Sequence, residues 1–338
     1  MPTKIINLSG GRTVDEKVLI DQELIGSRMQ RLWYLEQEEK LEILDFIKLS
    51  NPHLENNISK HKGNLILANG CTHISTSLFH LFKDEIFYVD KNIILHTFKR
   101  FIKMYNLKTT TNKDEATIEY KVIPHNPSRD TNMNPIGKKI KIILYDFYYN
   151  SDVFIDEPCK IPEDVMNNHT VIFYQSYSAT LFHQNGEHDR IAWLITNNNE
   201  LIYRLNNILY LHSCGLGRKG KESFLNLCKF YNNNQRKLSH DLEYNKDILL
   251  NNKKKFWDLL KNIDKNIQLL DKNLNSIDKE EFLKDRIPFI IAKLEEENLH
   301  DTLLDNNILS LPGYEFIQDE SDLKPENYVR LYFIEELK

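Results

Sequence analysis

Short apolar runs alternate with segments of helical periodicity through the first two thirds of the chain. Runs of four to eight apolar residues are typical of buried strands, and apolar residues spaced three and four apart are typical of helices. Strands separated by helices predict an α/β fold, with a mostly parallel sheet and helices on both faces. Ligands bind such a sheet at the carboxyl ends of its strands. The predicted strands are 64–68, 86–89, 118–123, 141–145, 170–174 and 190–195, and the predicted helices are 29–49, 74–82 and 199–211.

The composition shifts after Gly217, where Asn, Lys, Leu and Asp become frequent and helical periodicity continues. We expect helices over 221–284 that bridge to a small C-terminal α+β domain. A strand at 287–291, a helix at 293–304 and a strand at 328–334 would complete that domain. The predicted division is an N-terminal segment and helix at 1–55 that belongs to the small domain or caps the substrate, a large domain at 56–220, and the bridging helices with the small domain at 221–338.

Composition and charge argue against several classes of protein. The net charge of −5 comes from interspersed acidic and basic residues, so no basic footprint for nucleic acid is present. The four cysteines lack the CxxC spacing of zinc sites and form no evident disulfide framework, so we expect no metal. The chain has no signal-peptide pattern and no apolar stretch long enough to span a bilayer. We therefore expect a cytoplasmic protein without nucleic-acid or membrane partners.

Polar residues that suit ligand binding follow several of the predicted strands. Gly70 and Thr72 stand between a strand and a helix, where free N–H groups favour an anion. Asn126 precedes a proline, and Asp146 ends an apolar run with Tyr149 three residues later. Each residue alone has an ordinary reading, because Asn-Pro is a common turn and Asp often caps a helix. All of them fall at the carboxyl ends of predicted strands, where ligands bind, and this favours a shared site.

The segments Gln175–Thr180 and Arg190–Trp193 resemble the cofactor-anchoring turn of fold-type I enzymes that use pyridoxal phosphate (PLP). The resemblance is closest to the alliinase and plant tryptophan aminotransferase branch and covers roughly residues 60 to 335. In that family a lysine binds the cofactor covalently as a Schiff base, and Ala179 occupies the position of that lysine. No lysine occurs between Lys160 and Lys219 to replace it.

The resemblance implies a role for each matching residue. Asp146 would pair with the pyridine nitrogen, while Asn126 and Tyr149 would bond the phenolic oxygen of the ring. Cys71 stands where the family has serine, and the segment that supplies the stacking ring departs from the family, so either His96 or Phe98 could stack. The phosphate would be held by Gly70, Cys71, Thr72, Ser176, Ser178 and Arg190, the substrate α-carboxylate by Arg330, and a distal carboxylate by Arg12.

The implied function is a PLP-dependent enzyme that acts on an amino acid and works as a homodimer. Transamination and elimination or replacement chemistry both stay open, as does the identity of the substrate. Ala179 can neither hold PLP covalently nor carry a proton. The matches that survive around Ala179 favour an engineered Lys→Ala replacement, because natural loss would free those residues to drift. A natural pseudoenzyme or small-molecule binding protein, and a structural protein on the same scaffold, are the alternatives.

Overall fold

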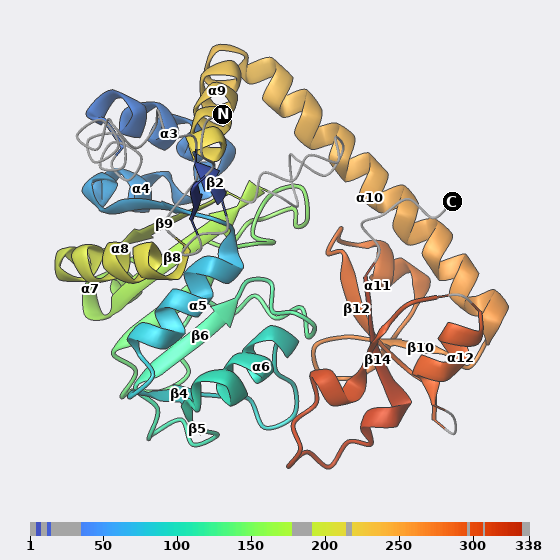
Figure 1. The fold of residues 1–338 in the computed structure, drawn as a ribbon. Coiled ribbons are helices and arrows are strands. Elements are labelled where there is room, and N and C mark those ends of the chain that lie inside the picture. The colour runs from blue at the N-terminus through green and yellow to red at the C-terminus, as the bar shows by residue number, and fades with distance from the viewer. Residues whose placement is uncertain are drawn as a thin grey trace.

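A seven-stranded sheet forms the centre of the larger part of the molecule (Figure 1). The computed structural model describes residues 5–7, 12–14, 35–177, 191–213, 218–295, 298–306 and 308–332. The strand order is β3-β9-β8-β7-β6-β4-β5, with parallel pairing from β8 through to β5 and β9 antiparallel to both its neighbours. This confirms the predicted fold class. The strands are β3 (Leu65–Ala68), β4 (Ile86–Tyr88), β5 (Lys108–Thr110), β6 (Ile118–Val122), β7 (Ile142–Asp146), β8 (Thr170–Ser176) and β9 (Ala192–Thr196).

Helices cover both faces of this sheet because its central strands are apolar on both sides. Leu144 and Ile172 point to the face covered by α5, α6 and α8, and their neighbours Ile143 and Val171 point to the face covered by α3 and α9. Continuous apolar runs are typical of parallel strands buried on both faces. The helices of this part are α3 (Gln37–Ser50), α4 (Glu55–Lys60), α5 (Cys71–Leu81), α6 (His96–Tyr105), α7 (Glu163–Asn168), α8 (Asn199–Ser213) and α9 (Arg218–Asn233), with short 3-10 turns at Pro52–Leu54 and Lys62–Asn64.

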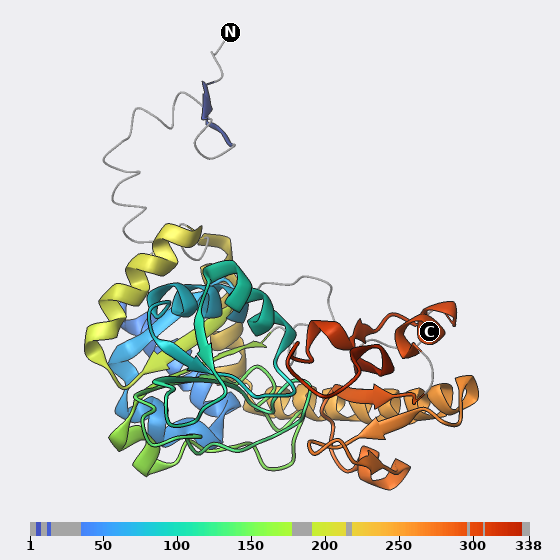
Figure 2. The same ribbon diagram turned by 90° about the horizontal axis from the view of Figure 1, so that it is seen from below.

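The long helix α10 (Gln235–Ile263) connects this part to a smaller C-terminal unit (Figures 1 and 2). That unit contains a five-stranded antiparallel sheet of order β11-β10-β12-β14-β13. Phe256 and Leu260 of α10 pack against this sheet in a separate hydrophobic cluster. Its elements are β10 (Gln268–Leu270), β11 (Ser276–Ile277), α11 (Lys279–Leu283), β12 (Phe289–Lys293), α12 (Leu299–Asp305), β13 (Leu311–Pro312) and β14 (Tyr328–Tyr332), with 3-10 turns at Gly313–Glu315 and Pro325–Asn327.

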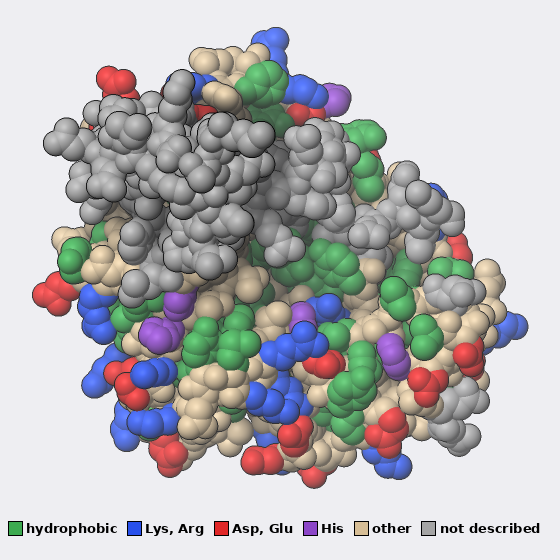
Figure 3. Space-filling view, in the orientation of Figure 1, with side chains coloured by type: hydrophobic (Ala, Val, Ile, Leu, Met, Phe, Trp, Pro, Cys, Tyr) green, Lys and Arg blue, Asp and Glu red, His purple; other side chains and the backbone are tan. Residues whose placement is uncertain are grey.

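A separate antiparallel pair, β1 (Ile5–Asn7) with β2 (Arg12–Val14), lies near the N-terminus. Acidic and basic side chains are interspersed over the coloured part of the face shown in Figure 3. No helix within the described ranges is long and apolar enough to cross a membrane.

Several predicted element boundaries were wrong. The segment 264–278 is not helical, because α10 ends at Ile263 and the chain forms the β10–β11 hairpin. The predicted helix at 293–304 starts only at Leu299, since β12 continues to Lys293 and the Asn298 side chain caps α12. Helix α5 starts three residues earlier than predicted, directly after Gly70. Helices α4, α6 and α7 and strands β5 and β13 were not predicted from the sequence.

Candidate functional site

A cavity of about 380 Å³ lies at the carboxyl ends of the central strands. Its walls come from the N-terminus of α5, the start of α6, and the segments that follow β6, β7 and β8. Ser178, Ala179 and Arg190 lie outside the described residues, as does the side chain of Arg12. Seven of the predicted site residues line this cavity together, namely Gly70, Cys71, Thr72, Asn126, Asp146, Tyr149 and Ser176.

Asp146, the last residue of β7, is a buried carboxylate with 6% of its surface exposed. It accepts hydrogen bonds from the Tyr148 N–H and the Tyr120 hydroxyl, each at 3.1 Å. The Cys71 thiol and the Tyr174 hydroxyl also bond to it. Burial raises the pKa of Asp146 to about 6, and the hydrogen bonds oppose that rise. A cationic N–H donor in the cavity would therefore stabilise the ionised carboxylate.

The N-terminus of α5 opens into the cavity through Gly70. The φ and ψ of Gly70 are 85° and 165°, a conformation that is essentially restricted to glycine. This turn starts the helix abruptly at Cys71 and leaves first-turn N–H groups for a ligand. Such a terminus favours an anion. Burial raises the pKa of the Cys71 thiol well above its usual range, and the thiol bonds to Asp146.

Arg330 on β14 of the small sheet does not line the cavity itself, but its guanidinium contacts two residues that do. Its Nη1 lies 3.2 Å from Oδ1 of Asn126 and 3.2 Å from Nδ1 of His96. Burial, with the charges of Arg330 and Arg100, lowers the pKa of His96 to about 4, so the neutral ring can accept this bond. The Nε of Arg330 is buried and has no partner among the described residues. A carboxylate would satisfy this donor.

The sequence left His96 and Phe98 as the two candidate rings for stacking on a ligand, and the structure distinguishes them. Phe98 lies in the core, where its ring stacks on Phe79 at 5.0 Å and meets Tyr120 edge-on at 5.0 Å. His96 instead lines the cavity. Tyr120 and Tyr148 also line it and were missed by sequence analysis. Within the predicted strand, Tyr120 had the pattern of an ordinary core residue, and only the folded sheet brings its hydroxyl to Asp146.

Two further predicted residues have partners that tie neighbouring elements together. Ser176 donates a hydrogen bond from its hydroxyl to the carbonyl of Ile191 at 2.9 Å, which joins the end of β8 to the start of β9. The Tyr149 ring packs edge-on against Phe154 and Phe289 with centroids 5.4 Å and 4.9 Å away. Burial raises the pKa of Tyr149 well above its usual range, so its phenol stays protonated as a donor.

No protein family model and no curated protein matches this sequence. Among solved structures, MJ0684 from Methanococcus jannaschii, described as similar in its active site to kynurenine aminotransferases, matches with a TM-score of 0.62 and 15% identity over 94% of this chain and 83% of that one. A probable N-succinyldiaminopimelate aminotransferase from Thermus thermophilus matches with a TM-score of 0.63 and 13% identity over 95% and 85%. Histidinol-phosphate aminotransferase from Clostridium acetobutylicum matches with a TM-score of 0.55 and 14% identity over 92% and 89%.

These likenesses show the fold, which is that of the fold-type I aminotransferases. Across the described ranges, no group of His, Cys, Asp and Glu side chains could hold a metal ion.

Proposed function

We propose that this chain binds PLP in the cavity around Asp146 and that its site is built for an amino acid joined to that cofactor. The observation that carries the proposal is the buried Asp146 carboxylate, whose pKa of about 6 reflects burial that its hydrogen bonds only partly offset. A protonated pyridine nitrogen is a cationic N–H donor that would stabilise such a carboxylate in its ionised form. The aminotransferase fold supports the same cofactor.

Three parts of the cavity fit three parts of the ligand. The N-terminus of α5, with Gly70 and Thr72, would hold the phosphate, assisted by Ser176 and by Ser178 and Arg190, which lie outside the described residues. The side chains of Asn126 and Tyr149 would bond the phenolic oxygen. The partnerless Nε of Arg330 would bind the α-carboxylate of the amino acid.

PLP, when bound, supplies an electron sink that acidifies the Cα proton of an attached amino acid. The residues of this chain would perform the remaining tasks. Asp146 would keep the pyridine nitrogen protonated, and Arg330 would fix the carboxylate and with it the direction of the Cα–H bond. His96 would hold the Arg330 guanidinium in place through the 3.2 Å hydrogen bond. Ala179 offers no proton acceptor, so we propose that the chain binds ligand but turns it over poorly or not at all.

The Ala179→Lys variant tests this assignment. We expect the variant to bind PLP covalently, giving a yellow protein whose adduct is fixed by borohydride and gains the mass of one reduced cofactor. The matched control is Thr180→Lys, which places the same amine one residue away and should give no such adduct. Turnover of an amino acid by Ala179→Lys would identify a working enzyme that lacks only its lysine. A covalent adduct without turnover would instead identify a natural binding protein or pseudoenzyme, and equal labelling of both variants would refute the placement of position 179.

We also propose that two copies of the chain associate, because fold-type I enzymes usually complete each site with residues of a second subunit. Arg12, on the N-terminal strand pair, is the residue proposed to reach a distal carboxylate. Light scattering at micromolar concentration should give the mass of a dimer, and a monomeric mass would contradict the proposal.

A further inference from the structure

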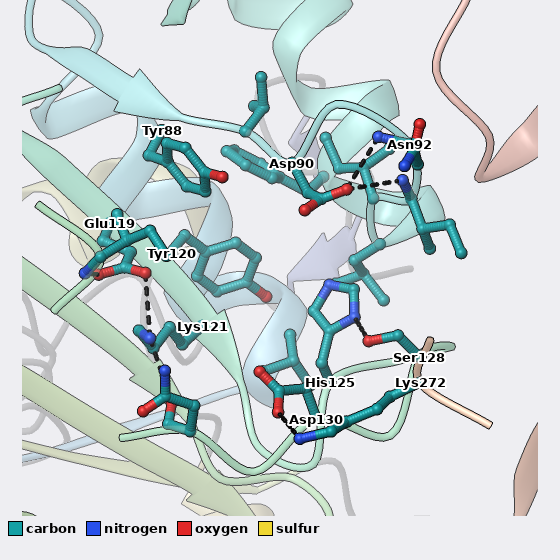
Figure 4. A pocket seen from close by; sticks show the side chains of 18 of the residues that line it. Tyr88, Asp90, Asn92, Glu119, Tyr120, Lys121, His125, Ser128, Asp130 and Lys272 are labelled. Atoms are coloured by element: carbon teal, nitrogen blue, oxygen red, sulfur yellow. Dashed lines mark hydrogen bonds and ion pairs between the residues drawn. The ribbon is translucent and has the colours of Figure 1, made fainter. Parts of the chain in front are cut away.

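A second cavity, of about 490 Å³, adjoins the cofactor cavity (Figure 4). The two cavities share Leu95, Tyr120 and Val122 as walls. The ring of Tyr120 borders the second cavity, while its hydroxyl bonds to Asp146 in the first. The proposed function assigns nothing to this space.

The second cavity lies where the direction of the chain through the sheet reverses. Strand β4 leads through α6 to β5 on one side, whereas β6 leads to β7 on the other side. The β4–β6 pairing is limited to Phe87 with Ile118, although β6 and β7 pair at five positions. The carboxyl ends of β4 and β6 are therefore not paired with each other. A crevice at such a switch point is the usual ligand site of an open α/β sheet.

Of the three carboxylates around the cavity, Asp90 is exposed to solvent and has no ion-pair partner among the described residues. Glu119 pairs with Lys121 at 3.0 Å, and Asp130 pairs with Lys272 at 3.2 Å. Asp90, directly after β4, accepts hydrogen bonds through Oδ1 from the N–H groups of Asn92 and Ile93 at 2.8 Å and 3.1 Å. Within the described part of the chain no cationic side chain pairs with Asp90. The lining thus has a net charge of −1, with three carboxylates and two lysines.

Aromatic and neutral polar groups complete the lining. The tyrosines Tyr88 and Tyr120 border the cavity, and ring faces attract cations. His125 bonds to the Ser128 hydroxyl through Nδ1 at 2.7 Å. Burial lowers the pKa of His125 to about 4, so this ring adds no positive charge that would repel a cation. Figure 4 shows the side chains of Asp90, Tyr120 and His125 directed toward the same open space.

We propose that this second cavity binds an organic cation, a primary ammonium carried on an apolar stem, with the ammonium at Asp90 and the stem along Ile94 and Leu95. The ammonium could belong to a free amine or to the distal end of a diamino acid that reaches across the shared wall from the cofactor cavity. Both sources present the same group to Asp90. The site itself does not depend on the proposed function.

Calorimetric titration of the purified chain with 1,5-diaminopentane tests the site, with 1-pentanol as the uncharged probe. We expect the diamine to bind and the alcohol not to bind. Asp90→Asn keeps the Oδ1 acceptor for both backbone N–H groups but removes the charge, and it should weaken diamine binding at least about tenfold, as expected for a charge-assisted hydrogen bond. The matched control is Asp84→Asn, which removes one charge before the opposite end of the same strand and should leave the affinity unchanged.

Two results would overturn the proposal. One is a lack of diamine binding. The other is an equal loss of diamine affinity in Asp84→Asn and Asp90→Asn, which would indicate only nonspecific attraction to an acidic surface.

Titration with L-lysine distinguishes the two sources of the ammonium, a free amine and a diamino acid. If lysine binds only when PLP is present, and if this binding is lost in Arg330→Met, the ligand is a diamino acid. If lysine and the diamine bind equally with and without PLP, and in both the wild type and Arg330→Met, the ligand is a free amine. PLP absorbance, recorded on the same samples, reports on the cofactor cavity separately.

Discussion

Asp146 combines two features that oppose each other in the ligand-free chain. Its burial disfavours the ionised form, yet four donors surround it to make that form tolerable. Neither Tyr120 nor Cys71 carries a positive charge, so the carboxylate is hydrogen-bonded but not neutralised by them. The cofactor proposed above, with a protonated ring nitrogen, would remove this cost.

The free-energy cost of burying the ionised Asp146 carboxylate predicts that Asp146 makes its own contribution to the pH dependence of stability. Its folded-state pKa of about 6 lies above an unfolded value near 3.9, so the native chain holds this proton more tightly. The resulting stabilisation is complete below about pH 4 and is lost as pH rises through 6. A shift of about two units corresponds to about 3 kcal/mol.

Urea unfolding of the ligand-free wild type and of Asp146→Asn measures this contribution. The free energy of unfolding of the wild type should fall relative to that of the variant between about pH 4 and pH 7, because the amide cannot ionise. Other titrating groups, such as the buried His53 and His125, are present in both proteins and cancel in the difference. Parallel curves would show that Asp146 is not buried as an isolated carboxylate.

Some of the candidate site residues could be predicted from the sequence and others could not, for a physical reason. Asp146 and Asn126 follow apolar strands, and the carboxyl ends of parallel strands meet at one edge, so their convergence could be predicted. The hydrogen bond of His96 to Arg330 joins residues 234 positions apart and depends on how the small sheet docks. The charge state of Asp146 likewise depends on Tyr120 and Tyr174, which lie within apolar strands and are indistinguishable there from core residues.

At the scale of the element, the junction of β3 and α5 determines where the proposed phosphate site lies. Gly70 adopts φ 85° and ψ 165° there, so α5 begins directly after it at Cys71, beside the cavity. The sequence predicted a helix here that starts three residues too late. Cys71, Thr72 and His73 have modest helix propensity, and no side chain caps the first turn. The glycine supplies the start that a capping residue usually supplies.

Gly70→Ala should destabilise the chain by about 1–3 kcal/mol, because alanine rarely adopts this conformation. It should also weaken PLP binding, since the first turn of α5 would shift. Gly63→Ala is the matched control, because a Cβ at Gly63 would meet no atom within 4 Å and its φ is not in the left-handed region. Chemical denaturation and a PLP titration of both variants check the prediction. Equal stabilities would show that the turn at Gly70 is not required.

The element boundaries that were predicted wrongly have different causes. The 264–278 hairpin forms because β10 pairs with β12, a contact between segments far apart in sequence. The helical periodicity of the residues before Ile263 does not predict where the helix ends and this strand pairing begins. Helix α6 was missed because its first turn contains His96 and Thr97, which the resemblance had marked only as a departure from the family.

At the scale of the whole molecule, buried charges join the two parts of the chain. Lys253 of α10 is fully buried and bonds to Oδ1 of Asp285 at 3.1 Å. Arg129, from the loop after β6, pairs with the same carboxylate. Burial lowers the pKa of Lys253 to about 8, which the carboxylate opposes. Asp285 thereby fixes the large sheet, α10 and the start of the small unit relative to one another, and with them the position of Arg330 beside Asn126.

Asp285→Asn should therefore destabilise the chain by about 3–5 kcal/mol, because it leaves the buried Lys253 and the partly buried Arg129 without a countercharge. Asp258→Asn removes a carboxylate of the exposed Asp258–Lys279 pair, and we expect a loss of no more than about 1 kcal/mol there. Guanidinium unfolding of both variants measures the contrast. Similar small losses would show that the cluster does not hold the two parts together.

The central claim is that the cavity around Asp146 binds PLP without a covalent bond, and a fluorescence titration of the unmodified chain with PLP tests it most directly. The account predicts saturable binding at micromolar concentration that survives in Asp84→Asn and weakens about 10–100-fold in Asp146→Asn, the loss expected when one hydrogen bond to a charged group is removed. Borohydride should fix no adduct at position 179. Absence of saturable binding, or equal affinities for the wild type and Asp146→Asn, would contradict the account.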